Sequence, residues 1–265
     1  MSESRQSFEK IRYEVADHVA TITLDDPETR NALSDQMLSE LLSALALAKD
    51  DYAVRVVVLA SSHEKVFSAG GNLAGFGGEA GTVEKFTGAS LFTDAFKALG
   101  ELGKPSIVAA EGHVLAGSLG LALACDLIIA SEDATFGTPE ITVGLFPFMI
   151  MALIYRNAGR KKTNEMLLLG ERISARDAKE AGIVNKVVRP ELFEANLEEW
   201  TKQLAAKSPL IMRMGKDAMW RQMDMPLIEA LDYLRSLLAI ELSSEDAIEG
   251  VKAFFEKREP EWKGR

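Results

Sequence analysis

Apolar and polar positions follow two different periods along the chain, and the change of period separates two kinds of structure. Between residues 19 and 24 apolar side chains alternate, so that Ala20, Ile22 and Leu24 share one face of a strand. Three further apolar runs have the character of strands buried on both faces. Ser34 precedes apolar residues at helical spacing and is expected to cap a helix. The predicted strands are residues 19–24, 54–60, 107–112 and 126–131.

The pattern changes near Pro190, after which amphipathic helical patterns continue to the C-terminus. Before that point, strands alternate with turns and helices, which predicts stacked β-β-α or β-α units and hence a mixed α/β fold. We expect an α/β core over residues 1–195 and a helical region over residues 196–265 that serves oligomerisation. The candidate helices are residues 191–206, 209–222, 226–243 and 244–258.

Composition narrows the partners that the chain can have. The 265 residues carry a formal net charge of −10, which argues against general binding to nucleic acid or to an anionic membrane. A local basic cluster at residues 160–162 still allows an anionic small ligand. Cys125 is the single cysteine, and the sequence has neither a secretory signal nor an apolar run of about 18 residues. We therefore expect a cytoplasmic protein that does not cross a membrane.

The stretch HVLAGSLGLALACD, residues 113–126, raises the possibility of a nucleophilic serine. Its Ala-Gly-Ser-Leu-Gly centre differs by one residue from the Gly-x-Ser-x-Gly turn of many hydrolases. The α/β-hydrolase order is impossible, because none of the three histidines follows Ser118. Orders in which a histidine comes first stay open through His18 or His63. We favour the interpretation that Ser118 is a small residue at a tight helix start.

Dinucleotide and metal sites are disfavoured. GFGGEA, residues 75–80, superficially fits a dinucleotide-binding pattern, but no strand directly precedes it and no helical pattern follows at once. We interpret residues 75–81 as a surface loop. The histidines are scattered and a single cysteine cannot make a thiolate site, so we expect no metal.

Two turns that expose backbone N–H groups carry the strongest chemical signal. They are FSAGGNL, residues 67–73, and the turn around Gly117, which leads into the apolar helix LGLALAC. Brought together, two such turns would form an oxyanion hole from the main chain alone. Glu140 follows Pro139 in an apolar segment, where a carboxyl group would have a raised pKa and could move protons. From the residues alone, a structural role for Glu140 is equally acceptable.

Five motifs in the same order resemble the enoyl-CoA hydratase/isomerase (crotonase) superfamily over nearly the whole chain. They are TITLDDPETRNALSDQM, VFSAGGNL, AAEGHVLAGSLGLALACDLIIASEDATFGTPEITVGLFP, SARDAKEAGIVNKVV and KAFFEKREPEW. The resemblance implies a crotonase-like spiral of repeated β-β-α units, with the acyl-CoA site in residues 1–195 and trimerisation helices in residues 196–265. It also implies acyl-CoA substrates, no metal or redox cofactor, and homotrimers that can pair as hexamers.

The resemblance also assigns roles by position. Gly71 and Gly117 match the family residues whose N–H groups bind the thioester oxygen, and Glu140 matches a catalytic glutamate. Phe254 and Lys257 match residues that reach the CoA adenine and phosphates from a neighbouring subunit, although core packing and a solvated charge would also explain them. The residues implied to hold the nucleotide and pantetheine are Arg30, Ala69, Asn72 and Leu73.

The chain departs from the family pattern at three places. Gly120 stands where hydratases commonly carry a second glutamate, Asn72 stands where aspartate is usual, and the bulky PFMIMALIY replaces a small glycine-rich stretch at residues 147–155. One carboxylate can move a proton between two carbons, whereas two can hold a water for addition. The family also contains hydratases that lack the second glutamate, so hydration and isomerisation both stay open.

Three other interpretations compete with an enoyl-CoA enzyme. A non-catalytic or weakly active acyl-CoA-binding homologue is suggested by Gly120 but opposed by the retained Glu140. RNA binding, known for some relatives, is disfavoured by the net charge of −10. Hydrolysis through Ser118 is the weakest of the three.

Overall fold

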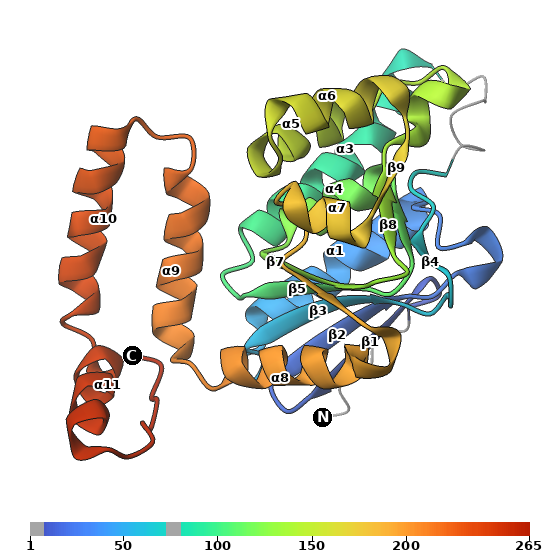
Figure 1. Cartoon of the computed structure of the whole chain (residues 1–265). Coiled ribbons are helices and arrows are strands. Elements are labelled where there is room, and N and C mark those ends of the chain that lie inside the picture. Colours follow the sequence, from blue (N-terminus) through green and yellow to red (C-terminus); the bar gives the residue numbers. More distant parts are fainter. Residues whose placement is uncertain (1–7, 73–80) are drawn as a thin grey trace.

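The computed structural model describes residues 8–72 and 81–265, which form a two-sheet core with helices on both sides (Figure 1). The larger sheet has the order β1-β2-β3-β5-β7-β10, with β1 antiparallel to β2 and the other pairs parallel. Its strands are Ile11–Ala16, Val19–Leu24, Val56–Ser61, Ser106–Ala110, Leu127–Ser131 and Lys186–Val188. The four predicted strands are thus confirmed, with ends that differ by up to two residues.

A second, shorter sheet has the order β4-β6-β8-β9. Its strands are Val66–Ser68, His113–Leu115, Thr135–Gly137 and Arg172–Ser174. Consecutive strands along the chain lie in different sheets: in the pairs β3/β4, β5/β6 and β7/β8, the first strand belongs to the larger sheet and the second to the shorter one. Helical structure follows each pair. This repetition is the predicted spiral of β-β-α units, and it brings the ends of β4, β6 and β8 side by side.

Both faces of the sheet are buried at the central strands β3, β5 and β7, which explains the continuous apolar run at β3. One face packs on α1 (Asp35–Asp50), α3 (Thr82–Gly100) and α4 (Gly117–Ala124) through the main hydrophobic core. The other face, with Val56, Val58 and Ile129, packs on α8 (Phe193–Ala205). Ser34 caps α1 as predicted, because its Oγ accepts a hydrogen bond of 3.2 Å from the N–H of Met37.

Three helices lie near the ends of the second sheet. They are α5 (Phe148–Asn157), α6 (Arg160–Leu169) and α7 (Ala175–Glu180). Short 3-10 turns occur at Pro27–Thr29, Pro139–Val143 and Pro190–Leu192, each with proline in its first turn. Proline suits this position because a helical first turn does not use its N–H.

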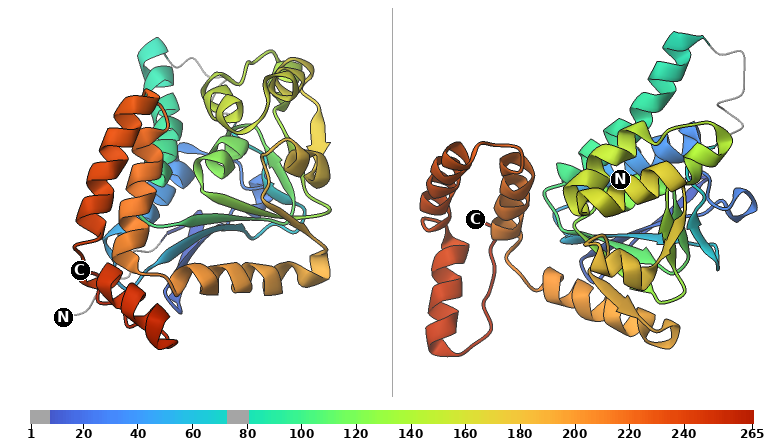
Figure 2. Two further views of the ribbon diagram at one scale, coloured as in Figure 1. Left: turned by 60° about the vertical axis from the view of Figure 1, so that its left-hand side comes forward. Right: turned by 45° about the horizontal axis from the view of Figure 1, so that its top comes forward.

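The last three helices stand beside the core rather than on it (Figure 2). They are α9 (Pro209–Gln222), α10 (Leu227–Glu241) and α11 (Glu245–Glu256), close to the predicted ranges. The predicted boundary between residues 195 and 196 falls inside α8, which packs against the core sheet. Large apolar side chains remain exposed on α10 and α11, among them Leu227, Ile228, Leu231, Leu238, Ile248, Val251, Phe254 and Phe255.

A buried ion pair fixes α9 to the core. Lys216 Nζ lies 2.7 Å from Asp126 Oδ1 and donates to the carbonyl of Leu99 at 3.2 Å. The other carboxylate oxygen of Asp126 accepts hydrogen bonds from the N–H and hydroxyl of Ser106, at 2.8 and 2.9 Å. These contacts link α9 to the end of α3 and to Asp126, the residue before β7. Within the described residues, no helix is long and apolar enough to cross a membrane.

Candidate active site

The two predicted turns meet at the ends of β4 and β6. A Cβ atom at Gly70 would lie 2.5 Å from the Cβ of Ala116 and 3.3 Å from the N of Gly117, so only glycine fits this close approach. Gly70 also has φ of +91°, which favours glycine. The first turn is held from its other side by Leu33, whose N–H donates to Gly70 O at 2.8 Å and whose O accepts from Asn72 N at 3.2 Å.

Two backbone N–H groups, one in each turn, belong to residues that line the same pocket and have no partner among the residues that the structure describes. In the bridge between Leu33 and Gly71, the bonds go to the residues on either side of Gly71, so the N–H of Gly71 takes no part. Gly117 is the first residue of α4, where an N–H has no partner within the helix. Neither group donates a hydrogen bond to another residue in the described part of the chain.

Ser118 holds this arrangement together and is not exposed for catalysis. The side chain is fully buried, and its Oγ accepts from Leu115 N at 2.9 Å. The same oxygen lies within donating distance of the carbonyls of Leu115 (2.7 Å) and Ser68 (3.0 Å). It therefore ties the first turn to the second. Neither His18 nor His63 shares a hydrogen bond with it, which is contrary to a serine hydrolase triad.

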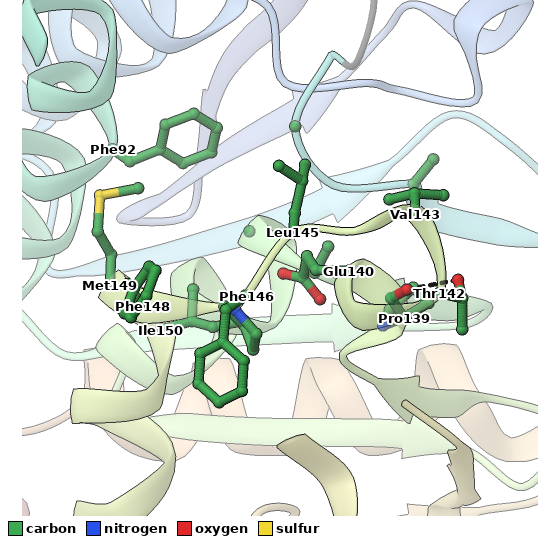
Figure 3. A pocket seen from close by; sticks show the side chains of 15 residues that line it. Phe92, Pro139, Glu140, Thr142, Val143, Leu145, Phe146, Phe148, Met149 and Ile150 are labelled. Atoms are coloured by element: carbon green, nitrogen blue, oxygen red, sulfur yellow. Dashed lines mark hydrogen bonds between the residues drawn. The ribbon is translucent and has the colours of Figure 1, made fainter. Parts of the chain in front are cut away.

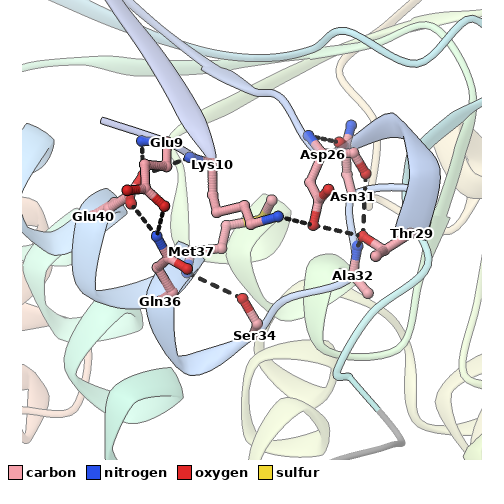
Figure 4. Close-up of polar contacts among 10 residues, drawn as sticks. All are labelled: Glu9, Lys10, Asp26, Thr29, Asn31, Ala32, Ser34, Gln36, Met37 and Glu40. Carbon is pink, nitrogen blue, oxygen red and sulfur yellow. Dashed lines mark hydrogen bonds and ion pairs between the residues drawn. The ribbon is translucent and has the colours of Figure 1, made fainter. Parts of the chain in front are cut away.

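Asn31 and Ser68 are positioning residues that the sequence analysis did not single out. Asn31 is fully buried and donates through Nδ2 to Ser61 Oγ at 2.8 Å and to Phe67 O at 3.3 Å. Its own carbonyl accepts from Ser68 Oγ at 2.6 Å. Figure 4 shows the other end of this loop, where Asn31 Oδ1 accepts from the N–H of Asp26 at 2.7 Å. An asparagine inside the NAL stretch gives no signal that it is buried, so periodicity could not find it.

An apolar pocket of about 290 Å³ lies next to the two N–H groups. Its wall combines the two turns with the 3-10 turn at Pro139–Val143 and the start of α5 (Figure 3). Helix α3 contributes Phe92. The lining residues are Ala69, Gly71, Phe92, Ala116, Gly117, Pro139, Glu140, Thr142, Val143, Leu145, Phe146, Pro147, Phe148, Met149 and Ile150. Glu140 is the one ionisable side chain among them.

The local sequence explains why Glu140 points into this pocket. Pro139 begins the 3-10 turn, and Gly144, with φ of +77°, ends it in the left-handed conformation. The hydroxyl of the preceding Thr138 is buried and donates to Met166 O at 2.8 Å, which anchors the turn to α6. The carboxylate therefore stands on a turn that is fixed at both ends.

Burial raises the pKa of the Glu140 carboxyl above its ordinary value, and a backbone hydrogen bond opposes this only in part. The Oε2 atom is buried and has no hydrogen-bond partner among the described residues. A buried carboxylate oxygen without a hydrogen-bond partner is destabilising for the fold. Such a group is typical of a site in which a carboxyl accepts and returns a proton.

Packed side chains fill the space beside Gly120, where the resemblance implies a second glutamate. Gly120 lies one helical turn after Ala116 on α4, and a Cβ there would lie 2.5 Å from Phe96 Cζ and 2.6 Å from Ile150 Cγ2. Such distances do not occur between real Cβ atoms and their neighbours, so any side chain at Gly120 requires repacking. Side chains of α3 and α5 therefore occupy the space that a glutamate at this position would need.

Comparisons with known proteins identify the family of this chain. The enoyl-CoA hydratase/isomerase family model matches residues 14–265. The chain belongs to the enoyl-CoA hydratase/isomerase family. It is 36% identical over 254 residues to carnitinyl-CoA dehydratase of Escherichia coli, covering 93% of this chain and 95% of that protein. It is 33% identical over 252 residues to 2,3-dehydroadipyl-CoA hydratase of Escherichia coli, covering 93% and 96%.

Solved structures place the chain in the same family. The crystal structure of enoyl-CoA hydratase from Mycobacterium smegmatis superposes with a TM-score of 0.92 at 35% identity, over 96% of this chain and 99% of that one. The chain is therefore an enzyme of the hydratase/isomerase family with the crotonase fold. The resemblance of the five sequence motifs to this family is confirmed.

The remaining family positions lie in three places. Ala69 lines the pocket, and the N–H of Ala69 donates to Arg30 O at 3.0 Å, so Arg30 and Ala69 adjoin the first turn together with Asn72. Leu73 lies outside the described residues, as do residues 75–80 of the predicted loop. Phe254 and Lys257 belong to α11 and its C-cap and do not line the pocket of their own chain. Their roles stay predictions, because they concern a neighbouring subunit.

Proposed function

We propose that this family member moves a double bond along an unsaturated acyl-CoA thioester by proton transfer through Glu140. The observation that carries the proposal is a single carboxylate in an apolar pocket beside two unpaired backbone N–H groups. No other carboxylate lines this pocket among the described residues. The chemistry available to such a site is enolate formation with one acid/base group.

The N–H groups of Gly71 and Gly117 supply the first half of the reaction. Both donate to the thioester carbonyl oxygen, whose negative charge grows when a proton leaves the neighbouring carbon. The positive end of the α4 dipole lies at Gly117 and adds to this stabilisation. Removing one donor of this kind costs other enzymes about 2.7–4 kcal/mol in transition-state stabilisation.

Glu140 supplies the second half. As a carboxylate it removes a proton from C2 of a 3-enoyl thioester, which leaves a dienolate whose charge rests on the thioester oxygen. As a carboxylic acid it then returns a proton to C4, so that the double bond moves to C2–C3 and the enzyme is regenerated. A raised pKa suits both steps, because the acid and base forms are then closer in energy near neutral pH.

Hydration is a second candidate, favoured by the names of the relatives at 33–36% identity. In that reaction Glu140 would orient and deprotonate a water that adds to C3. Phe96 and Ile150 fill the space beside Gly120, so in a hydration Glu140 would have to hold and deprotonate that water alone. Thr142 does not replace a second carboxylate, since its hydroxyl already donates to Pro139 O at 2.7 Å.

We further propose that CoA lies along Arg30, Ala69, Asn72 and Leu73 and that the chain assembles as a homotrimer or as a hexamer of two trimers. The exposed apolar side chains of α10 and α11 support an assembly, because such patches are rarely left open to solvent. In that assembly Phe254 and Lys257 would reach the CoA of a neighbouring subunit. No further cofactor enters the proposed reaction.

The direct experiment is to supply a 3-enoyl-CoA thioester and to follow its conversion to the 2-enoyl isomer by chromatography. The wild-type protein is expected to convert it, and Glu140→Gln is expected to lose about 10²–10⁴-fold in rate. Glu64→Gln is the matched control, because Glu64 is exposed and lies outside the pocket. Bound CoA thioesters without turnover in the wild type would instead support the non-catalytic interpretation.

A further inference from the structure

Ala116 has a backbone conformation that alanine rarely adopts. Its φ is 53° and its ψ is −130° at the position that caps the N-terminus of α4. These angles lie near about +60° and −120°, the first central position of a type II′ turn, which glycine usually occupies. Of the non-glycine residues with positive φ in the described part of the chain, Ala116 alone lines the acyl pocket. Such a conformation is destabilising, and strain of this kind gathers at functional sites.

The strained angle of Ala116 also decides where the N–H of Gly117 points. The carbonyl of Ala116 and the N–H of Gly117 belong to one peptide group, which rotates with the ψ of Ala116. At the same φ, an alanine is relaxed when its ψ is about +30° to +60°. That change would turn the peptide group by roughly 180° and direct the N–H to the opposite side. The direction of the donor and the strain therefore have the same origin.

Two hydrogen bonds hold Ala116 in this conformation. Its N–H donates to the carbonyl of Gly137 in β8 at 2.9 Å, and its carbonyl accepts from the N–H of Leu119 at 2.9 Å. The second bond would break if the peptide group turned, because the carbonyl would turn together with the N–H of Gly117. Strand β8 and the first turn of α4 thus keep the residue at angles that it would not adopt by itself.

The methyl group of Ala116 separates the two turns of the site. A Cβ on Gly70 would lie 2.5 Å from the Cβ of Ala116, so the methyl group fills the space beside the residue that precedes Gly71. Ala116 is buried, with 9% of its surface exposed. The Oγ of Ser118, 3.0 Å from the carbonyl of Ser68, ties the same two turns together. One contact keeps the turns apart and the other holds them together, and both act on the separation of the two N–H donors.

Ala116, and not Ser118, lies where a hydrolase of the α/β class carries its nucleophile. In those enzymes the serine lies on a strained turn between a strand and a helix, and the N–H of the next residue belongs to the oxyanion hole. Here the turn between β6 and α4 has Ala116 at its strained position, and the next residue is Gly117. The chain therefore has the geometry of that turn with a methyl group in place of the nucleophile.

We infer that Ala116 is a positioning residue whose strained backbone and methyl group fix the direction of the Gly117 N–H and its separation from the Gly71 N–H. Glycine would adopt the same angles without strain. It would also leave a gap of one methyl group beside Gly70 and could adopt many other angles. The inference rests on the proposed function for the thioester oxygen that both donors bind, and it adds a residue that acts through those donors.

The first test is Ala116→Gly in the full-length protein, assayed with a 3-enoyl-CoA thioester. The kcat should fall about tenfold or more, because a misplacement of about 1 Å in a reacting site can cost about a hundredfold. KM should stay within about threefold, since the loss of an interaction made only in the transition state lowers kcat and kcat/KM together. The Tm should stay the same or rise, because relief of the strain offsets the loss of a buried methyl group.

Ala134→Gly is the matched control. Ala134 is fully buried in the turn between β7 and β8, does not have a positive φ and does not line the pocket. The same chemical change there should lower the Tm by about 3–7 °C and leave kcat and KM unchanged.

Three outcomes for Ala116→Gly would overturn the inference. An unchanged kcat, at any Tm, would mean that the methyl group does not position the donors. A raised KM with an unchanged kcat would mean that the methyl group only contacts the substrate. A Tm that falls as far as in Ala134→Gly would mean that the backbone of Ala116 is not strained.

A spectroscopic test separates this inference from the proposed function. The probe is butanoyl-CoA with heavy carbon at the thioester carbonyl, bound to each protein and followed by infrared difference spectroscopy. In the wild type and in Ala134→Gly the carbonyl band should move to lower frequency on binding, because hydrogen bonds from Gly71 and Gly117 weaken the C=O bond. In Ala116→Gly this shift should be smaller.

Equal shifts in all three proteins, or no shift in the wild type, would overturn the inference. If the wild type shows the shift but converts no enoyl thioester, the proposed function fails and the inference about Ala116 stands.

Discussion

Replacing Glu140 with glutamine should have opposite effects on activity and on stability. The substitution keeps the size of the side chain and removes its charge. In the wild type Oε2 is buried without a hydrogen-bond partner among the described residues, and burial raises the pKa of the carboxyl. The folded state therefore holds the proton more tightly than the unfolded state does.

The sign of the pH dependence follows from this. With a folded-state pKa above the unfolded value, the stability that the neutral carboxyl contributes is complete below the unfolded pKa. It is lost as the pH rises through the folded pKa. An unsatisfied buried polar group costs about 1–3 kcal/mol. Glutamine keeps a neutral polar group at this place, so the gain of Glu140→Gln is the extra cost of burying the charged form. For a partly buried side chain we take this as about 1–2 kcal/mol in the free energy of unfolding at pH 8.

The assay is thermal unfolding of the wild type and of Glu140→Gln at a series of pH values between about 4 and 9. At about 2–4 °C per kcal/mol, the Tm of the variant should exceed that of the wild type by about 2–8 °C at the alkaline end. The difference should shrink as the pH falls. Glu64→Gln should show no such trend. A Tm difference that is constant or grows toward acid would refute the account of Glu140 as a buried carboxyl with a raised pKa.

Three further predictions concern the packing around the site and are checked by urea or thermal unfolding of purified variants. Gly120→Ala should lower the free energy of unfolding by about 1–3 kcal/mol through overpacking. Adding Phe96→Ala should relieve that clash, so a double variant whose loss equals the sum of the two single losses would contradict the prediction. Lys216→Met leaves Asp126 buried without its cation and should cost about 3–5 kcal/mol, whereas a loss below about 1 kcal/mol would mean that the pair is solvated. Ser118→Ala should cost about 1–3 kcal/mol, and an unchanged midpoint would show that its three contacts are dispensable.

The sequence predicted the repeated units because their signals are local. Alternation in β2, a cap at Ser34 and apolar runs at β3 and β7 each arise within a few residues, and the structure confirms them. The helices after Pro190 could be predicted equally well. Their apolar spacing indicates the helices, and the proline and serine residues between them mark their ends without any tertiary information. The strand ends shifted by one or two residues, where turn geometry overrides the apolar pattern.

Only some of the residues of the site could be predicted from the sequence. Gly71, Gly117 and Glu140 could be chosen because glycine and an isolated carboxyl stand out in apolar surroundings, and the resemblance of the motifs gave them roles. Asn31 could not be chosen, because its importance lies in a hydrogen bond across 36 residues to Phe67.

Phe92 and Phe96 carry no local signal of a place near the site, and the sequence analysis did not select them. The structure places their rings against Gly117 and Gly120, so that Phe92 lines the pocket and Phe96 packs beside it. Contacts between elements distant in sequence set the shape of the pocket, and no local pattern records them.

The central claim is that Glu140 moves a proton between carbons without adding water. The most direct test is mass spectrometry of the products formed from 2-enoyl- and 3-enoyl-CoA thioesters in water labelled with heavy oxygen. The account predicts an isomer of unchanged formula with no labelled oxygen in the acyl chain, and a rate that falls in Glu140→Gln. A product heavier by one labelled water, formed faster than the isomer, would contradict it and would mean that a lone glutamate activates water in this pocket.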